Sequence, residues 1–449
     1  MNRNIAYCCF FLIILLTGCM AAPAEDLYSL PEMSTSYSHL QELVNKEIDS
    51  GSEFAGPITG LYRQSIHFYD INSDGNDEAF VFFRTSGSFL KICVYDRNGN
   101  DYSLKTAITG EGSSIWRIDF ADLNGDGISE IIVTWQISSG LRLLNVYGFS
   151  ENDAPVLISY NCTDFQIADM NRDGSPDIIL FQLNSPNGEN GNAKLLLFPP
   201  GHDPVVHTAS LSKGLYSIER VKTGSLSDGV FAMFIEGKYA GSSANISEQF
   251  ITDIVTYKEG GFRNISLDSN TGISRTIRKG SDNAYIGDPN NDKIIDVPEA
   301  VRLYTQPGQT RQYSALDWYS FSSTGEKQLT VSTYHSTEGW YLTLTPQWRK
   351  NLTVRRDEVW SGERGVVLSF VDPETKEIND FMIIYTLTGD NRHDRAHLAD
   401  RFLLLDEGAT IFVGKILMDK SLWNGALSEA EIKSRFKIIH TEWSTGALQ

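Results

Sequence analysis

The chain has 449 residues and a formal net charge of −19, with 41% hydrophobic and 11% aromatic residues. This excess of acidic groups disfavours binding to nucleic acid and docking of a polybasic face on a membrane. The hydrophobic content is sufficient for folded cores, and the length leaves room for two domains.

The N-terminal segment carries the features of an export signal. Arg3 precedes an apolar stretch from Ala6 to Leu16, which ends in Leu-Thr-Gly-Cys at Cys19. The stretch is too short for a spanning helix, and the small residues before the cysteine resemble the lipobox of bacterial lipoproteins. We therefore expect a signal peptide over residues 1–18, lipidation at Cys19 and a tether over 19–35, with the protein anchored to a bacterial cell membrane and facing outward. An ordinary secretory signal is the alternative.

Two further features are a predicted helix before the main domain and two cysteines within it. Apolar residues at Leu40, Val44 and Ile48 have helical spacing, so an amphipathic helix is expected within 36–55, packed on the domain that follows. Cys93 and Cys162 fall in different predicted repeats, so free buried thiols are expected.

Four acidic loops mark residues 56–345: Asp70–Glu78, Asp122–Glu130, Asp169–Asp177 and Asp288–Asp296. Oxygen-bearing side chains recur at positions one, three, five and nine, and position seven offers its backbone carbonyl. Such all-oxygen loops favour Ca²⁺ over zinc or copper. The predicted metal ligands are Asp70, Asn72, Asp74, Asn76, Glu78, Asp122, Asn124, Asp126, Ile128, Glu130, Asp169, Asn171, Asp173, Ser175, Asp177, Asp288, Asn290, Asp292, Ile294 and Asp296.

These loops are not EF-hands, at least in the first three cases. An EF-hand has a bidentate Glu at position twelve, where this chain has Val81, Val133 and Leu180. Each of these loops is followed by a run of β-branched and aromatic residues, which predicts a strand. The fourth loop has Glu299 at position twelve, but Lys293 replaces the glycine at position six, and we assign it to the same strand-flanked set.

The loops also indicate a repeat. Their first residues are 52, 47 and 119 residues apart, and the long interval contains a degenerate turn at Asp228-Gly229. In the first unit, alternating runs at 66–69, 78–84, 89–95 and 102–108 predict four strands, with a turn at Asn98-Gly99 between the last two.

Tandem strand-loop-strand units containing Asp-x-Asn-x-Asp-Gly-x-x-Asp/Glu resemble the FG-GAP or VCBS-type repeats of integrin-α-like β-propellers. The resemblance covers about residues 60–345. It implies a mainly β fold, a calcium-loop β-propeller of five to seven blades, with the loops between adjacent strands of a blade. Two departures concern the sites: Glu78 and Glu130 are longer than the usual Asp, and Lys293 places a cation beside the fourth loop.

The remaining residues, 346–449, differ in character. Strands are expected at 366–370, 381–385 and 410–414, a helix over Arg392–Leu403, and a second helix opened by the capping box Ser428–Glu431. These elements predict a small α+β C-terminal domain.

Two motifs outside the loops admit a chemical interpretation. His393 and His397 have the spacing of a zinc-protease pair, but Asp394 stands where that motif needs Glu, so an exposed polar helix is the simpler interpretation. Aromatic residues between Trp318 and Trp348 are either a sugar-stacking platform or, more simply, core.

No catalytic residue and no organic cofactor is predicted, because the sequence has neither a nucleophile elbow nor a phosphate-binding loop. The sequence thus predicts a lipid-anchored, calcium-binding surface propeller that binds an unidentified protein or carbohydrate. The alternatives are a calcium-dependent polysaccharide-degrading enzyme, by analogy of fold alone, and an export or envelope-assembly factor.

Overall fold

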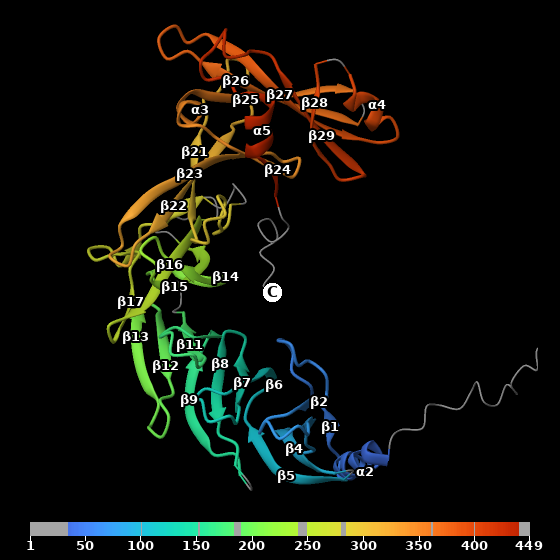
Figure 1. Cartoon of the computed structure of the whole chain (residues 1–449). Coiled ribbons are helices and arrows are strands. Elements are labelled where there is room, and N and C mark those ends of the chain that lie inside the picture. Colours follow the sequence, from blue (N-terminus) through green and yellow to red (C-terminus); the bar gives the residue numbers. More distant parts are fainter. Residues whose placement is uncertain are drawn as a thin grey trace, which may run out of the picture. The chain divides into compact units, whose positions relative to one another are not determined.

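The computed structural model describes residues 35–99, 101–150, 153–183, 190–240, 249–279, 284–360, 362–398 and 400–439. The fold is mainly β, as predicted, and its sheets follow one another along the chain (Figure 1). The chain divides into two compact units: Met1–Phe120 with Gly127–Ser139 and Asn145–Leu157 form the first, and the remainder forms the second.

The first sheet has the order β1-β3-β4-β5, with β2 also paired to β3. All of its pairs are antiparallel. The strands are β1 (Glu53–Phe54), β2 (Ile66–Tyr69), β3 (Glu78–Arg84), β4 (Leu90–Asn98) and β5 (Asp101–Gly110). The four predicted strands are therefore confirmed, and the predicted turn lies where Asn98 pairs with Asp101.

Three more sheets repeat this up-and-down order. The second contains β6 (Ser114–Ala121), β7 (Glu130–Ser138), β8 (Leu141–Tyr147) and β9 (Val156–Cys162). The third contains β10 (Asp164–Ala168), β11 (Asp177–Gln182), β12 (Asn192–Leu197) and β13 (Val205–Ser210). The fourth contains β14 (Leu215–Ser225), β15 (Phe231–Tyr239), β16 (Gln249–Lys258) and β17 (Gly261–Asn264), with β20 (Arg278–Lys279) also on β16. A short hairpin, β18 (Leu267–Asp268) and β19 (Ile273–Ser274), follows.

The fifth sheet recruits a strand from near the C-terminus. It has the order β21-β22-β23-β24-β30. Its strands are β21 (Val297–Arg302), β22 (Ser314–Phe321), β23 (Lys327–His335), β24 (Trp340–Thr343) and β30 (Phe436–Ile438). Sheets of four antiparallel strands in sequence order are typical of propeller blades. No closed propeller is identified among the described residues, so ring closure and blade number remain predictions.

The sixth sheet has the order β25-β26-β27-β29-β28. Its strands are β25 (Leu352–Trp360), β26 (Glu363–Val371), β27 (Ile378–Thr388), β28 (Phe402–Asp406) and β29 (Thr410–Ile416). Three short helices accompany it: α3 (Pro346–Asn351), α4 (Arg392–Ala396) and α5 (Glu429–Arg435). The three strands predicted in this region lie in β26, β27 and β29, and both hydrogen bonds of the predicted capping box open α5.

One predicted helix is wrong in extent. The segment Arg392–Leu403 was expected to be helical, but α4 ends at Ala396 and β28 begins at Phe402. Asp400 has a φ of 68°, which an α-helix does not tolerate. Phe402 is buried and pairs with Gly414 of β29, so pairing within the sheet overrides the local helical pattern.

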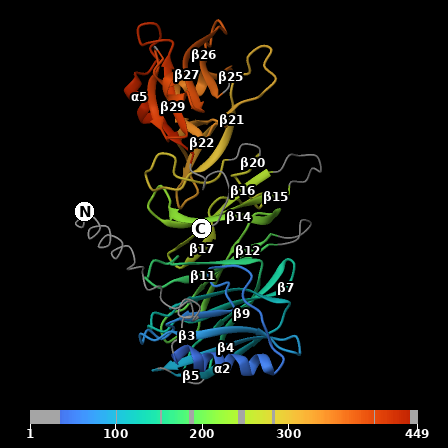
Figure 2. The same cartoon turned by 90° about the vertical axis from the view of Figure 1, so that its right-hand side faces the viewer.

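Helix α2 (Thr35–Asp49) packs on the first sheet, beside β5 (Figure 2). Leu40 and Val44, one turn apart, are buried in one hydrophobic cluster with Val81 and Phe83 of β3. The Lys91 ammonium of β4 lies 2.8 Å from a carboxylate oxygen of Glu47, which ties the polar side of the helix to the same sheet. The free cysteines, Cys93 and Cys162, are both buried.

Candidate functional site

The acidic loops occupy equivalent places in the first three sheets. Loop 1 (Asp70–Glu78) joins β2 to β3, loop 2 (Asp122–Glu130) joins β6 to β7, and loop 3 (Asp169–Asp177) joins β10 to β11. Loop 4 (Asp288–Asp296) differs, because its two ends are paired by an isolated bridge between Gly287 and Asp296 and not by two strands. Strand β21 follows it directly.

Loop 3 illustrates the hydrogen bonding inside these loops. The Asp169 carboxylate accepts the N–H of Asp173 at 3.1 Å and the N–H of Gly174 at 3.1 Å. The Asn171 side-chain oxygen accepts from the same N–H of Asp173 at 3.0 Å, and Asp173 accepts from the N–H of Ser175 at 2.9 Å. Positions one, three and five thus wrap the chain around their oxygens, as Asx turns do.

The same pattern recurs in the other loops. The corresponding acceptors are Asp70, Asn72 and Asp74 in loop 1, Asp122 and Asn124 in loop 2, and Asp288, Asn290 and Asp292 in loop 4. This shared geometry groups loop 4 with the others despite its different place in the topology.

The backbone explains the glycine at position six. Gly75, Gly127 and Gly174 have φ values of 87°, 87° and 100°, in a region that favours glycine. Lys293 has a φ of 69° at the same position and bears a Cβ, so position six is strained in loop 4.

Position nine places a buried carboxylate at the base of each loop. Glu78, Glu130 and Asp177 are the first residues of β3, β7 and β11, and all three are buried, as is Asp296. Glu78 accepts the N–H of Ile71 at 3.0 Å, and Asp177 accepts the N–H of Met170 at 2.8 Å. The position-nine side chain therefore closes the loop onto its own second residue in loops 1 and 3.

These carboxylates are costly to bury in charged form. Burial, together with the charges of nearby carboxylates, raises the pKa values of Glu78, Asp177 and Asp296 to about 7. One oxygen each of Glu78 (Oε1) and Asp296 (Oδ1) has no hydrogen-bond partner among the described residues. A buried acceptor without a partner requires an explanation, and an absent donor or ion is one.

The position-seven residues were predicted to act through their carbonyls. That role stays a prediction; the bonds described here are donated by the N–H groups of Ser175 and Ile294 to position five and by the Asn76 side-chain amide to Asp74, at 3.0 Å. As the side chains stand, the described part of the chain contains no group of three or more His, Cys, Asp or Glu that could hold a metal ion. Each loop thus gathers its acidic side chains within a short turn, but their oxygens are not arranged as a complete set of metal ligands.

Successive loops contact one another. The N–H of Ser129 in loop 2 donates to the carbonyl of Ile71 in loop 1 at 2.8 Å, and the hydroxyl of Ser73 donates to the carbonyl of Gly127 at 3.0 Å. A Cβ placed on Gly125 of loop 2 would lie 3.2 Å from the Ser175 hydroxyl of loop 3. Loops 1 and 2 are therefore joined by direct hydrogen bonds.

The degenerate turn at Asp228 has a different role. It joins β14 to β15, where the other sheets have an acidic loop, and the Asp228 carboxylate accepts the N–H and the hydroxyl of Ser323 at 3.1 and 2.6 Å. A protein donor thus satisfies this carboxylate.

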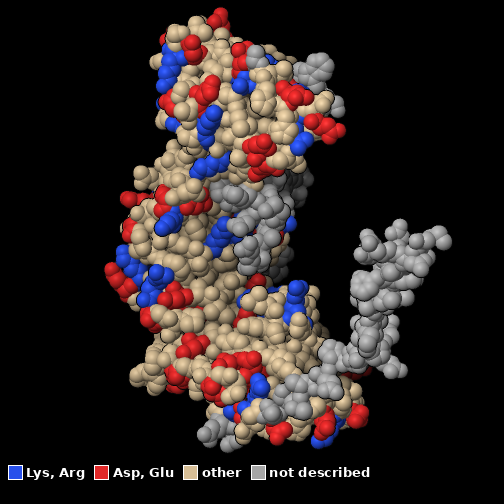
Figure 3. Space-filling model, turned by 45° about the vertical axis from the view of Figure 1, so that its right-hand side comes forward, with Lys and Arg blue, Asp and Glu red and all other residues tan. Residues whose placement is uncertain are grey.

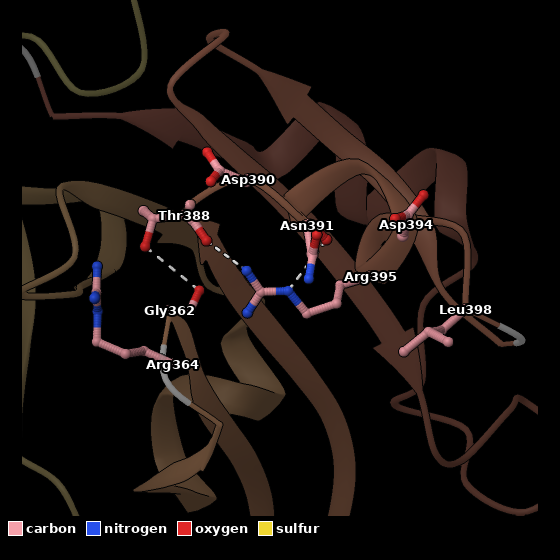
Figure 4. Close-up of a pocket in the computed structure, with 9 residues that line it drawn as sticks. Gly362, Arg364, Thr388, Asp390, Asn391, Asp394, Arg395 and Leu398 are labelled. Carbon is pink, nitrogen blue, oxygen red and sulfur yellow. Dashed lines mark hydrogen bonds between the residues drawn. The ribbon is translucent and has the colours of Figure 1, made fainter.

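The histidine pair does not form a metal site in the described residues. Helix α4 is a single turn, both imidazoles are exposed, and Nδ1 of His397 lies 2.7 Å from the carbonyl oxygen of His393. Asp394 lines an open pocket of about 920 Å³ with Arg364, Asp390 and Arg395, but neither histidine does (Figure 4). Arg395 is held by the carbonyls of Thr388 and Asn391. The zinc-protease interpretation therefore has no geometric support here.

The aromatic cluster belongs to the core. Trp318, Tyr334, Trp340, Tyr341 and Trp348 are all buried. The stacking-platform alternative is therefore wrong for these five rings, because a sugar requires an exposed face. Tyr319 is partly exposed, but Lys327 lies over its ring, 3.8 Å from the centroid.

Two predictions concern the N-terminal segment. The signal peptide and Cys19 lie outside the described residues. Within the described residues, no helix is both long and apolar enough to cross a membrane.

Sequence reasoning missed the distant partners of the sites. The hydroxyl of Thr330 in β23 donates to Asp296 at 2.7 Å, and the hydroxyl of Tyr341 lies 3.4 Å from the carbonyl of Pro289 in loop 4. These contacts connect residues more than thirty positions apart, and no local pattern in the chain indicates them.

Comparison with known proteins agrees with the loop geometry. A search of curated proteins gives no match to this chain. Residues 70–133 match the family model of the FG-GAP-like repeat, a span that contains loops 1 and 2 and the contact between them. Residues 70–133 therefore contain an FG-GAP-like repeat.

Proposed function

We propose that the protein is a calcium-stabilised, β-propeller-like binding module, anchored by a lipid at Cys19 to the outer face of a bacterial membrane. The observation that carries the calcium proposal is the buried carboxylate at position nine. Glu78 and Asp296 each keep one oxygen without a donor in the described residues. Asp96 and Asp74 lie close enough to Glu78 to act on its charge, as Asp292 and Asp288 do on Asp296.

The donor set fits Ca²⁺. Carboxylate, side-chain amide and backbone carbonyl oxygens are the ligands that this cation prefers, and its flexible coordination tolerates both Glu and Asp at position nine. Positions one, three, five, seven and nine of each loop would hold the ion. Bound calcium would neutralise the clustered carboxylates and lower the pKa of the position-nine group.

The position-nine residues determine which part of the fold calcium binding stabilises. Position nine begins a buried strand in loops 1 to 3, so a fixed carboxylate also fixes the start of β3, β7 and β11. Without a cation, like charges in each loop repel, and the strand ends loosen. Calcium is thus structural, and the binding of a partner is left to other surfaces.

Calorimetric titration with calcium, beside thermal melts with and without chelator, tests the proposal. We expect three or four sites, because Lys293 weakens loop 4, and a melting temperature that falls on chelation. Asp169→Ala should remove one site and lower the melting temperature in calcium, whereas Glu374→Ala, an exposed carboxylate in the turn between β26 and β27, should change neither. Absence of both binding and a melting shift would refute the calcium role.

The anchor has a separate test. The protein should fractionate with membranes, and Cys19→Ala should release it into the soluble fraction. Equal membrane retention of the variant would contradict lipidation at this residue.

A further inference from the structure

A cleft of about 480 Å³ lies between two sheets of the second unit. One wall is β20, which pairs with β16, and the other is β21, the edge strand of the fifth sheet. Its polar lining comprises Arg278, Lys279, Glu299, Arg302, Gln312 and Ser314. The volume is within the range of small-molecule sites.

The cleft has an excess of positive charge in an acidic protein. Lys279 and Arg302 are exposed, and neither has an ion-pair partner among the residues that the structure describes. The carboxylate of Glu299 is already paired, at 2.5 Å, with Lys327, which does not line this cleft. Figure 3 shows acidic and basic side chains interspersed over one face of the molecule.

Arg278 fixes the position of this charge. Its side chain is buried, forms an ion pair with the buried Glu236 and donates to the hydroxyl of Thr252 at 2.9 Å. Burial lowers its pKa to about 9, so it is still protonated at neutral pH. The adjacent Lys279 belongs to the same strand and pairs with Gln249 of β16.

The opposite wall adds a second donor. Arg302 and Ser314 are directly paired across β21 and β22, so their side chains lie on the same face of the sheet. The side-chain amide of Gln312 donates to the carbonyls of Leu303 and Tyr313 and accepts from the hydroxyl of Thr305, so these bonds hold its position in the cleft wall. Ile277 adds apolar surface beside these groups.

We propose that this cleft is a binding site for an oxyanion, a carboxylate or phosphate group, carried by a small hydroxylated ligand. Arg302 pairs with the anion through its planar guanidinium, and Lys279 contributes a second charge from the facing strand. The Ser314 hydroxyl and the Glu299 carboxylate hydrogen-bond to hydroxyl groups of the ligand. Affinity is modest, because the cleft is open to water and salt screens exposed charges.

The proposal extends the binding module to a ligand class, but it does not depend on the calcium loops. It fails or succeeds on anion titration, whereas the calcium proposal fails or succeeds on calcium stoichiometry and melting. Anion binding that does not depend on calcium would support the anion site, and the calcium proposal would still be decided by its own titration.

Isothermal titration at low salt with glucuronate, glucose and inorganic phosphate tests the site. We expect the anions to bind with a Kd of about 0.1–10 mM and glucose not to bind measurably. Arg302→Gln and Lys279→Gln should each weaken anion binding by about tenfold. Arg263→Gln, which removes an exposed arginine of β17 outside the cleft, is the matched control and should leave binding unchanged.

The titrations with glucuronate and with phosphate distinguish the two sources of the anion. Tighter binding of glucuronate identifies a sugar acid, and tighter binding of phosphate identifies a phosphorylated ligand; both support the site if the two cleft variants weaken it. No binding of either anion, or an equal loss in Arg263→Gln, overturns it. Thermal melts of all variants show that the cleft substitutions leave the fold intact.

Discussion

Lys293 and Gly75 occupy equivalent positions of two loops and differ in conformational cost. Both have positive φ, 69° and 87°, and a Cβ at Gly75 would meet no atom within 4 Å, so its cost would come from the backbone alone. A non-glycine residue in this region costs about 1–2 kcal/mol.

The exchange of these two residue types is therefore a paired experiment. Lys293→Gly should raise stability by about 0.5–1 kcal/mol and raise the calcium affinity of loop 4, because it removes both strain and a competing cation. Gly75→Lys should lower stability by about 1–2 kcal/mol and weaken loop 1. Urea denaturation with and without calcium measures both; shifts of the same sign in the two variants would contradict the prediction.

His335 gives the folded state a pH dependence. Its imidazole stacks on Tyr341 at 5.2 Å between centroids, and burial lowers its pKa from 6.5 to about 4. The unfolded chain takes up this proton below pH 6.5, but the folded chain does so only near pH 4, so this residue's contribution to stability is complete above pH 6.5 and is lost as pH falls toward 4.

Substitution isolates that contribution. In His335→Phe, the decrease in the free energy of unfolding between pH 6.5 and 4 should be smaller than in the parent by about 1–3 kcal/mol. Chemical denaturation at several pH values measures it. His202→Phe, at an exposed position, should keep the parental slope, and an unchanged slope in His335→Phe would show that the imidazole is not responsible.

At the scale of single elements, the turn between β14 and β15 shows how a sheet holds together without an acidic loop. Asp228→Ala removes the acceptor for both Ser323 donors and should cost about 1–3 kcal/mol, by the same amount with calcium and with chelator. Asp228→Asn keeps one oxygen and should cost less. A loss that appears only in calcium would instead make this turn a metal site.

The loops were predictable from sequence because their geometry is local. Each hydrogen bond accepted by position one or five spans at most five residues, and glycine at position six follows from the backbone angle. The roles of Asp70 and Gly174 can therefore be recognised from the residues next to them in the sequence. The strands after the loops were predictable for the same reason, since runs such as that in β3 are buried and β-branched or aromatic.

The parts that could not be predicted depend on distant contacts. Phe402 pairs with Gly414 instead of continuing a helix, Thr330 donates to Asp296 from another strand, and Lys279 and Arg302 line one cleft from two different sheets. A pattern read along the chain contains no information about which strand edges meet.

At the scale of the whole molecule, Phe436 connects two sheets of the second unit. It lies in β30, which pairs with β24, and its ring is 5.6 Å from Trp340 of β24 and 5.5 Å from Phe412 of β29. One hydrophobic core therefore serves both the fifth and the sixth sheet.

Phe436→Ala should cost about 3–5 kcal/mol and destabilise both sheets in one transition. Hydrogen exchange of amides in β24 and β27, with denaturation followed by tryptophan fluorescence, measures this effect. Leu422→Ala, at a residue that is 68% exposed, should be nearly neutral. Separate transitions for the two sheets would instead support an independent C-terminal domain beginning near residue 346.

The bonds between loops 1 and 2 have a consequence for calcium uptake. Because Ser129 donates to Ile71, and Ser73 to Gly127, ordering one loop also orders acceptors and donors of the next. Under the calcium proposal, the conformational entropy lost when the first loop becomes rigid is not lost again at its neighbour, so a second ion would bind with higher affinity. The saturation curve should be steeper than for independent sites, and the loops should fill and empty together.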